Sequence, residues 1–218
     1  MPLLHQTLQD TTAEHPQQIA FEEGDRILNY EQFYNRVEAL AGALQSLGVA
    51  KGDRVSILAN NCSDYLCLHY ACCSIGVILH VLNTRLATTE MLWALQNAES
   101  RMLVVDEANS HKLEELTRDM PCIQHRIGIG ELAQVDAGVK VKPPRILADD
   151  PVLLIYTSGT TGQPKGALQT HRGSCWNDRL TAEQLGLTDK GVYLALIHIF
   201  IRRVLFIAAR RFPAVGRT

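Results

Sequence analysis

The sequence predicts an α/β fold in which parallel strands are flanked by helices. Short apolar runs that are typical of buried strands alternate with segments of helical periodicity along most of the chain. The apolar run Val152–Ile155 leads directly into a loop of glycines and hydroxyl residues. The chain has 218 residues, 46% of them apolar and 20% charged, which is enough for one large domain with a substantial core.

The first helix is expected over Glu31–Leu47, where apolar residues recur at helical spacing. Asn29 can cap this helix with Gln32 three residues later, and Gly48 can end it. An irregular connection, which includes Pro143-Pro144, is expected from about residue 130 to residue 150. The other expected elements are a strand over Arg54–Ala59, a helix over Ser63–Ile75 ended by Gly76, a strand over Val77–Leu82, a helix over Thr88–Asn97 capped by Thr88, a strand over Met102–Asp106 and a helix over His111–Arg118.

The stretch from Tyr156 to Gly166 has the composition of a phosphate-binding loop. Glycines allow positive φ and close approach of an anion to the backbone, hydroxyls and N–H groups donate hydrogen bonds, and one lysine adds a positive charge. The lysine follows Pro164 and precedes Gly166, so the loop differs from the Gly-x-x-x-x-Gly-Lys-Ser/Thr pattern of nucleoside triphosphatases. A surface turn rich in glycine and serine is the alternative. The residues expected to bind phosphate are Thr157, Ser158, Gly159, Thr160, Thr161, Gly162 and Lys165.

This stretch resembles the signature loop of the adenylate-forming enzymes, the AMP-dependent synthetase/ligase superfamily. The resemblance extends from about residue 7 to about residue 197. Further stretches that carry it, in the family's order, are Asn29-Tyr30, Gly48–Val55, Leu82–Leu86 and Thr170-His171. The resemblance implies the N-terminal part of the large adenylation domain, with parallel-strand-rich sheets flanked by helices and incomplete at its C-terminal end.

The resemblance also implies a reaction. Relatives join a carboxylic acid to ATP, with Mg²⁺, to give an acyl-adenylate, and then transfer the acyl group to coenzyme A (CoA). Leu82–Leu86 favours acyl-CoA ligases over adenylation domains of peptide synthetases. The family's adenine, ribose and Mg²⁺ motifs and its catalytic lysine would lie beyond residue 218, so we expect this chain alone to lack full activity and identify no catalytic residue or metal ligand in it. The alternative is a non-enzymatic remnant that at most binds polyphosphate weakly.

The last residues differ in composition from the rest, which suggests a boundary after residue 197. From Gly191 to Thr218 there are five arginines and no acidic residue. Relatives continue with a Pro-x-Phe-His motif where this chain has His198-Ile199-Phe200-Ile201, and a one-base shift of the reading frame can restore that motif. We therefore expect residues 198–218 to be an aberrant basic tail, out of frame or truncated. A membrane-surface helix is the alternative.

Composition excludes several other classes. The net charge of −2 argues against a nucleic-acid partner, and neither a signal peptide nor an apolar run long enough to span a membrane is evident, so a cytoplasmic protein is expected. The six cysteines lack metal-ligand spacing and are expected to be reduced. The oligomeric state is not predicted. Outside the loop, His171 could line a nucleotide pocket or pack structurally, Arg85 is expected in a structural ion pair, and packing roles are expected for His69, His80 and Trp93.

Overall fold

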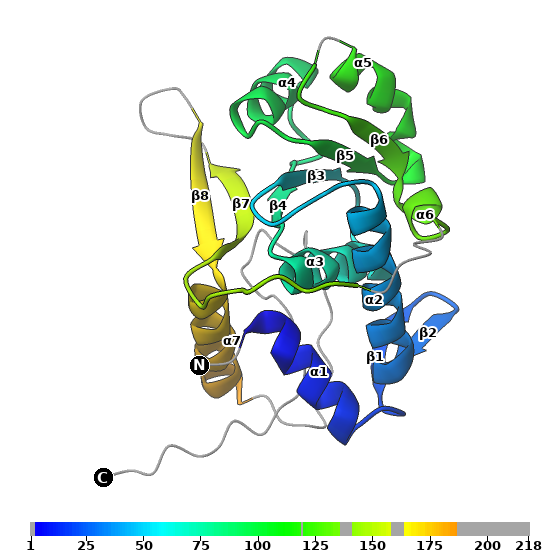
Figure 1. Ribbon diagram of the computed structural model, residues 1–218, viewed down its shortest axis with the longest axis vertical. Coiled ribbons are helices and arrows are strands. Elements are labelled where there is room, and N and C mark those ends of the chain that lie inside the picture. The colour runs from blue at the N-terminus through cyan, green and yellow to red at the C-terminus, as the bar shows by residue number, and fades with distance from the viewer. Residues whose placement is uncertain (1–2, 119, 136–140, 158–163, 187–218) are drawn as a thin grey trace.

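The core of the protein is a six-stranded sheet with the strand order β6-β5-β3-β4-β7-β8 (Figure 1). The computed structural model describes residues 3–118, 120–135, 141–157 and 164–186. All neighbouring strands are parallel except β7 and β8, which form an antiparallel pair. The strands are β3 (Arg54–Leu58), β4 (Ile78–Val81), β5 (Met102–Val105), β6 (His125–Gly128), β7 (Pro151–Thr157) and β8 (Lys165–Thr170).

Helices cover both faces of this sheet, as Figure 1 shows. Helices α2 (Tyr30–Ser46) and α3 (Ser63–Ile75) contribute most of the larger apolar cluster on one face. Helices α4 (Thr88–Asn97) and α5 (Leu113–Thr117) pack on the other face, against β3 and β5. The predicted α/β architecture with parallel strands is therefore confirmed.

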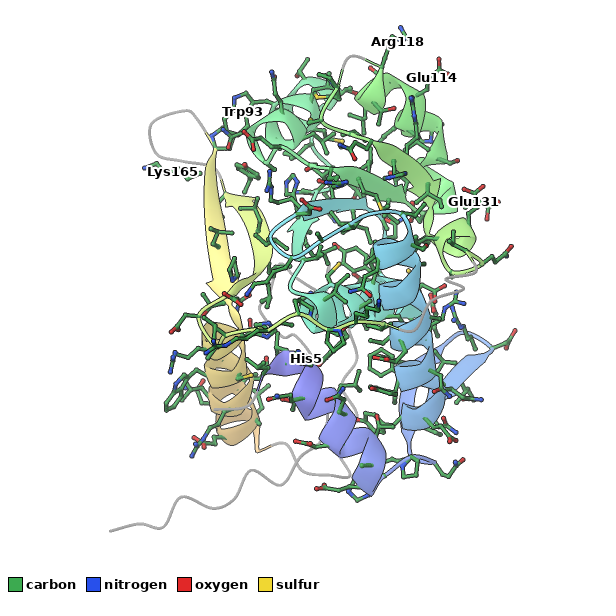
Figure 2. All side chains as sticks on the ribbon, viewed as in Figure 1. His5, Trp93, Glu114, Arg118, Glu131 and Lys165 are labelled. Carbon is green, nitrogen blue, oxygen red and sulfur yellow. The ribbon has the colours of Figure 1, made fainter. Side chains whose placement is uncertain are left out.

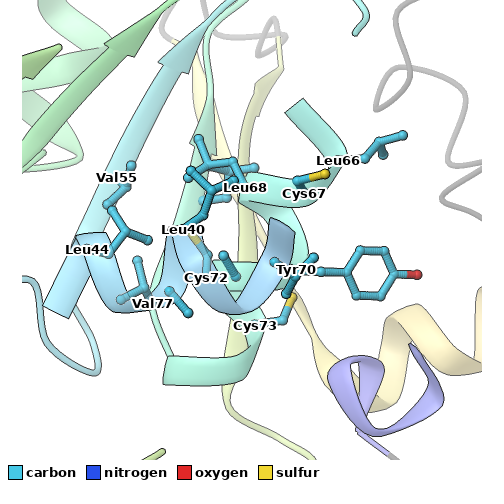
Figure 3. Packing of buried hydrophobic residues seen from close by; sticks show 14 of the residues in the cluster. Leu40, Leu44, Val55, Leu66, Cys67, Leu68, Tyr70, Cys72, Cys73 and Val77 are labelled. Carbon is cyan, nitrogen blue, oxygen red and sulfur yellow. The ribbon is translucent and has the colours of Figure 1, made fainter. Parts of the chain in front are cut away.

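The larger cluster is built by alternate residues of the strands and by nearly every position of α3. Figure 3 shows Leu40 and Leu44 of α2 close to Val55 of β3 and to Leu68 and Cys72 of α3. All five of these side chains are fully buried. A helix this uniformly buried needs cover from several elements, and α3 obtains it from the sheet, α2 and α1 (Leu4–Glu14).

Two predicted helix boundaries are confirmed by their capping geometry. The Asn29 side chain accepts a hydrogen bond from the Gln32 N–H at 2.8 Å, and the Gln32 side chain accepts one from the Asn29 N–H at 3.0 Å. Gly76 ends α3 with a φ of 70°, a conformation that favours glycine. The range of α4 is also as predicted, but the cap is not. Its N-cap is Ala87, whose N–H donates to the Glu90 carboxylate at 2.9 Å, so Thr88 is the first helical residue.

Several elements were not predicted. The chain begins with α1 and with a separate antiparallel hairpin of β1 (Ile19–Glu23) and β2 (Arg26–Asn29). The helix expected over His111–Arg118 is instead the 3₁₀ helix η1 (Glu107–Lys112) followed by the short α5. The expected irregular connection is interrupted at its start by α6 (Ile129–Leu132). Weak apolar periodicity in these short elements explains why the pattern did not reveal them.

The cysteines are free, as expected. Burial raises the thiol pKa of five of them, so these thiols are protonated at neutral pH and pack as small apolar groups. None of the helices in the described part of the chain has the length and apolarity required to cross a membrane.

Candidate phosphate-binding site

The antiparallel pair β7 and β8 holds the two ends of the predicted phosphate loop together. Thr157 is the last residue of β7, Lys165 is the first residue of β8, and the two are register partners. The Thr157 hydroxyl donates to the Lys165 carbonyl at 3.4 Å. The loop thus begins and ends on neighbouring strands, β7 and β8, of the sheet. The remaining predicted phosphate-binding residues, Ser158, Gly159, Thr160, Thr161 and Gly162, lie outside the described residues.

Lys165 is exposed at the outer end of β8, beside the loop (Figure 2). In the part of the chain that the structure describes, no carboxylate forms an ion pair with its ammonium group. The backbone of Lys165 is fixed by strand pairing, and its ammonium group has no ion-pair partner among the described residues. Such a lysine can bind an anion without first breaking an ion pair. The structure therefore presents Lys165 in a state suited to phosphate binding.

Strand β8 corrects the expectation that Lys165 and Gly166 belong to the loop itself. Both residues are part of an extended strand, and Gly166 does not have a positive φ. A Cβ atom added at Gly166 would lie 3.0 Å from Leu154 Cδ1 and 3.3 Å from Tyr156 Cε1. Glycine is favoured here because the Leu154 and Tyr156 side chains of β7 lie close to the position of a Cβ, and not because the chain turns.

The segment after β4 lies at the end of the sheet where β7 also finishes, because β4 and β7 are parallel neighbours. Strand β4 runs parallel to β7, with Val81 opposite Ile155, so the turn from Asn83 follows β4 close to the start of the phosphate loop. The Asn83 side chain accepts a hydrogen bond from the Arg85 N–H at 3.0 Å. Arg85 is exposed, and no carboxylate of the described residues pairs with it, so the expected structural ion pair is not found.

His171 lies at the start of α7 (His171–Leu185) and is fully buried. Its Nδ1 accepts a hydrogen bond from the Leu4 N–H at 3.2 Å, and its ring packs edge-on against His5 at 5.8 Å. Burial, together with the smaller effect of the neighbouring His5, lowers the pKa of His171 to about 4. Of the two roles considered for His171, the geometry supports packing, because the imidazole joins α7 to α1.

His80 and Trp93 lie near the loop and form packing contacts, as expected. His80 on β4 is buried, and its Nδ1 is 2.7 Å from the Ser56 hydroxyl. Burial lowers the pKa of His80 to about 3, so the ring is neutral at physiological pH. Trp93 is half-buried on α4, and both rings pack edge-on against Tyr156. Sequence reasoning did not reveal this aromatic group, because its members come from three separate elements.

The described residues contain no group of three histidine, cysteine or acidic side chains that could hold a metal ion. Two exposed cations, Lys165 and Arg85, lie on the segments that border the predicted loop. The site therefore offers complementary charge to an anion such as a polyphosphate, and a metal ion bound there would be held largely by that anion.

The fold and the loop define the class of protein. Residues 8–210 match the family model of the AMP-binding enzymes, so the chain belongs to this family. The match confirms the resemblance to adenylate-forming enzymes. It extends to residue 210, beyond the boundary expected after residue 197. The proposed tail, residues 198–218, lies outside the described residues, and its origin stays a prediction.

The relatives are CoA ligases. The chain is 32% identical to a 2-succinylbenzoate–CoA ligase of Oceanobacillus iheyensis, over 84% of this chain and 36% of the relative. It is 29% identical to a crotonobetaine/carnitine–CoA ligase of Salmonella typhimurium, over 80% of this chain and 37% of the relative. The chain thus spans little more than a third of the length of these two curated relatives.

Solved structures agree with this placement. The o-succinylbenzoate CoA synthetase of Bacillus subtilis, in complex with an acyl-adenylate intermediate, is 28% identical with a TM-score of 0.80, covering 91% of this chain and 50% of that chain. The same enzyme has been solved with ATP and a magnesium ion, with a TM-score of 0.78 and 26% identity. The described fold therefore corresponds to the N-terminal half of an adenylation domain.

Proposed function

We propose that this chain is the N-terminal portion of an ATP-dependent acyl-CoA ligase and that its β7–β8 loop binds the phosphates of ATP. The observation that carries the proposal is the hairpin in which Thr157 and Lys165 are paired and the Lys165 ammonium is exposed. Thr157, Ser158, Gly159, Thr160, Thr161 and Gly162 would donate hydroxyl and backbone N–H groups, and Lys165 its charge. Family membership, together with relatives solved with ATP, magnesium ion and acyl-adenylate, supports this assignment.

The proposed chemistry explains why such a loop is needed. A carboxylate attacks the α-phosphate of ATP, and negative charge grows on the departing pyrophosphate. Fixed N–H and O–H donors and a lysine stabilise that charge, because they are oriented before the reaction begins. Bound Mg²⁺ would neutralise further phosphate charge. The acyl group would then pass from the adenylate to the thiol of CoA.

We infer that the substrate is a carboxylic acid of the fatty-acyl or aryl class. The support is the resemblance of Leu82–Leu86 to CoA ligases and the names of the relatives, which act on 2-succinylbenzoate and on crotonobetaine or carnitine. We also infer a cytoplasmic location, since six free cysteines suit a reducing compartment. Neither a nucleic-acid partner nor a membrane partner is proposed.

The second candidate is a remnant that binds polyphosphate without catalysis. It applies to the 218 residues taken by themselves, which span 36% of the O. iheyensis relative. The complete reaction is therefore proposed for a protein that contains the remaining family segments, and binding alone is proposed for residues 1–218.

Thermal stabilisation by ATP with Mg²⁺ tests the binding step. A ligand present at ten times its Kd stabilises the folded state by about 1.4 kcal/mol, which gives a measurable shift in Tm. We expect a shift for the unmodified chain and about tenfold weaker binding for Lys165→Ala. Lys142→Ala is the matched control, because Lys142 is also exposed but lies in the connection before β7.

The outcomes separate the candidates. Equal binding by the unmodified chain and by Lys165→Ala would place the ATP site away from this loop. An absent ATP shift in a folded chain would refute both the loop assignment and weak binding by a remnant. Release of pyrophosphate upon addition of a carboxylic acid would show that the chain has the adenylation activity itself.

A further inference from the structure

Tyr156 connects the phosphate loop to helix α4. It is the residue before Thr157, where β7 meets the loop, and it is half-buried. Its hydroxyl donates a hydrogen bond to Asn97 Oδ1, the last residue of α4, at 2.6 Å. The hydroxyl therefore joins the end of β7 to a helix that lies elsewhere in the sequence.

The ring of Tyr156 is held on two further sides. It packs edge-on against Trp93 of α4, with ring centroids 5.5 Å apart and an interplanar angle of 79°. It also packs edge-on against His80 of β4 at 5.3 Å and 73°. His80 is itself fixed, since Ser56 binds its Nδ1 at 2.7 Å and also bonds Ser100 at 2.5 Å. Edge-to-face contacts of this kind orient a ring as well as bury it.

The same ring supports the other arm of the loop. Tyr156 is the register partner of Gly166, and its Cε1 lies 3.3 Å from the position a Cβ would take there. Gly166 is bonded directly to Lys165. The Tyr156 side chain thus belongs to the arm that ends in Thr157 and lies close to Gly166 on the arm that begins with Lys165.

We propose that Tyr156 is a positioning residue for the phosphate loop and that it acts through its hydrogen bond to Asn97. The bond fixes the loop arms, and with them Lys165, relative to α4. This inference rests on the proposed function, because the effect is measured as phosphate binding. The reasoning is geometric: the pairing of β7 with β8 is one anchor for Thr157 and Lys165, and the bond from Tyr156 to α4 is a second.

Tryptophan fluorescence provides a direct measurement. The chain has two tryptophans, Trp93 beside Tyr156 and Trp176 exposed on α7. In a Trp176→Phe background, Trp93 alone reports, and titration with magnesium triphosphate avoids the absorbance of adenine. We expect binding to change the Trp93 emission, and Tyr156→Phe to weaken binding about fivefold, the effect of losing one neutral hydrogen bond. Its Tm should fall by no more than about 3 °C.

The control and a double-mutant cycle separate positioning from general stability. Tyr34→Phe is the control. Tyr34 of α2 is also half-buried, and its hydroxyl accepts a hydrogen bond from Gln9 of α1 at 3.2 Å. It should bind triphosphate normally. Asn97→Ala should weaken binding as much as Tyr156→Phe, and the double variant should be no weaker than either single one. Asn97 is exposed, so its replacement tests the proposal even where Tyr156→Phe fails to fold.

Each result decides between the two proposals. Unchanged affinity in Tyr156→Phe or Asn97→Ala, with normal binding by the unmodified chain, would overturn the positioning role and leave the phosphate site intact. Additive effects in the double variant would overturn the route through Asn97. If the unmodified chain does not bind triphosphate, as measured by calorimetry, the proposed function fails and the positioning role fails with it.

Discussion

Acidification should destabilise the protein through histidines that are buried in the neutral form, and His171 is the one that can be tested most directly. The perturbation is a change from pH 7.5 to pH 5.0. His171 is 0% exposed, and its Nδ1 accepts a hydrogen bond from the Leu4 N–H. A proton on Nδ1 would remove that acceptor, and burial lowers the pKa of His171 to about 4. His69 and His80 are also fully buried, and burial lowers the pKa of each to about 3.

The magnitude follows from proton linkage. An unfolded histidine has a pKa of about 6.5, so between that value and about pH 4 the unfolded chain binds more protons at His171 than the folded chain. The free energy of unfolding therefore falls as the pH falls below about 6.5, by about 1.4 kcal/mol per pH unit. At pH 5 the loss is about 2 kcal/mol from His171 and about 6 kcal/mol from the three histidines. This is comparable to the whole stability of many domains, about 5–15 kcal/mol.

Urea denaturation at both pH values, for three proteins, is the assay. His171→Asn retains an oxygen acceptor for the Leu4 N–H but removes the titration. We expect it to be less stable at pH 7.5 and to lose about 2 kcal/mol less than the unmodified chain on acidification. His111→Asn, at an exposed position of η1, should show the full acid loss. An acid loss in His171→Asn equal to that of the unmodified chain would refute the reasoning.

Two further substitutions follow from the close contacts at Gly166 and from the burial of Asp178. Gly166→Ala places a Cβ 3.0 Å from Leu154 Cδ1, so we expect a loss of about 1–3 kcal/mol in thermal or urea denaturation, and an unchanged Tm would contradict the close packing of β7 on β8. Burial raises the pKa of Asp178 to about 8, so this carboxyl is protonated in the fold and its contribution to stability is lost as pH rises from about 4 towards 8. Asp178→Asn should therefore stabilise the protein, by about 2 kcal/mol more at pH 7.5 than at pH 5.5, and an equal gain at both pH values would speak against a raised pKa.

Local signals in the sequence were sufficient for the central helices and strands. Asn29 with Gln32 marks the start of α2, and Gly76 marks the end of α3, because capping and positive φ are decided by residues next to one another. The phosphate loop is predicted in the same way, from its glycines, hydroxyls and lysine, and its phosphate binding stays a prediction. Thr88 was assigned as a cap from residue type alone, whereas the structure uses Ala87 and the Glu90 carboxylate.

Long-range contacts explain what the sequence did not reveal. The role of His171 depends on Leu4, which is 167 residues away along the chain. The support of the loop by Tyr156 depends on Asn97, 59 residues away. Strand β8 has no strict alternation of apolar and polar residues, and it is a strand because β7 offers it a hydrogen-bonding edge. Periodicity describes how one segment meets a core, and it carries no information about which segment becomes its neighbour.

The position of β7 in the sheet has a consequence for the order of assembly. Strands β3 to β6 come from one continuous stretch, residues 54–128, and can pair with one another before β7 is present. Leu79 of β4 meets Leu153 of β7 only after a much longer segment has closed, and β8 then joins β7 across a short loop. We therefore expect the β7–β8 hairpin to join the sheet last and, because β8 is an edge strand, to be less protected than the central strands. Amide hydrogens of β7 and β8 should therefore exchange faster than those of β3, which hydrogen exchange can measure.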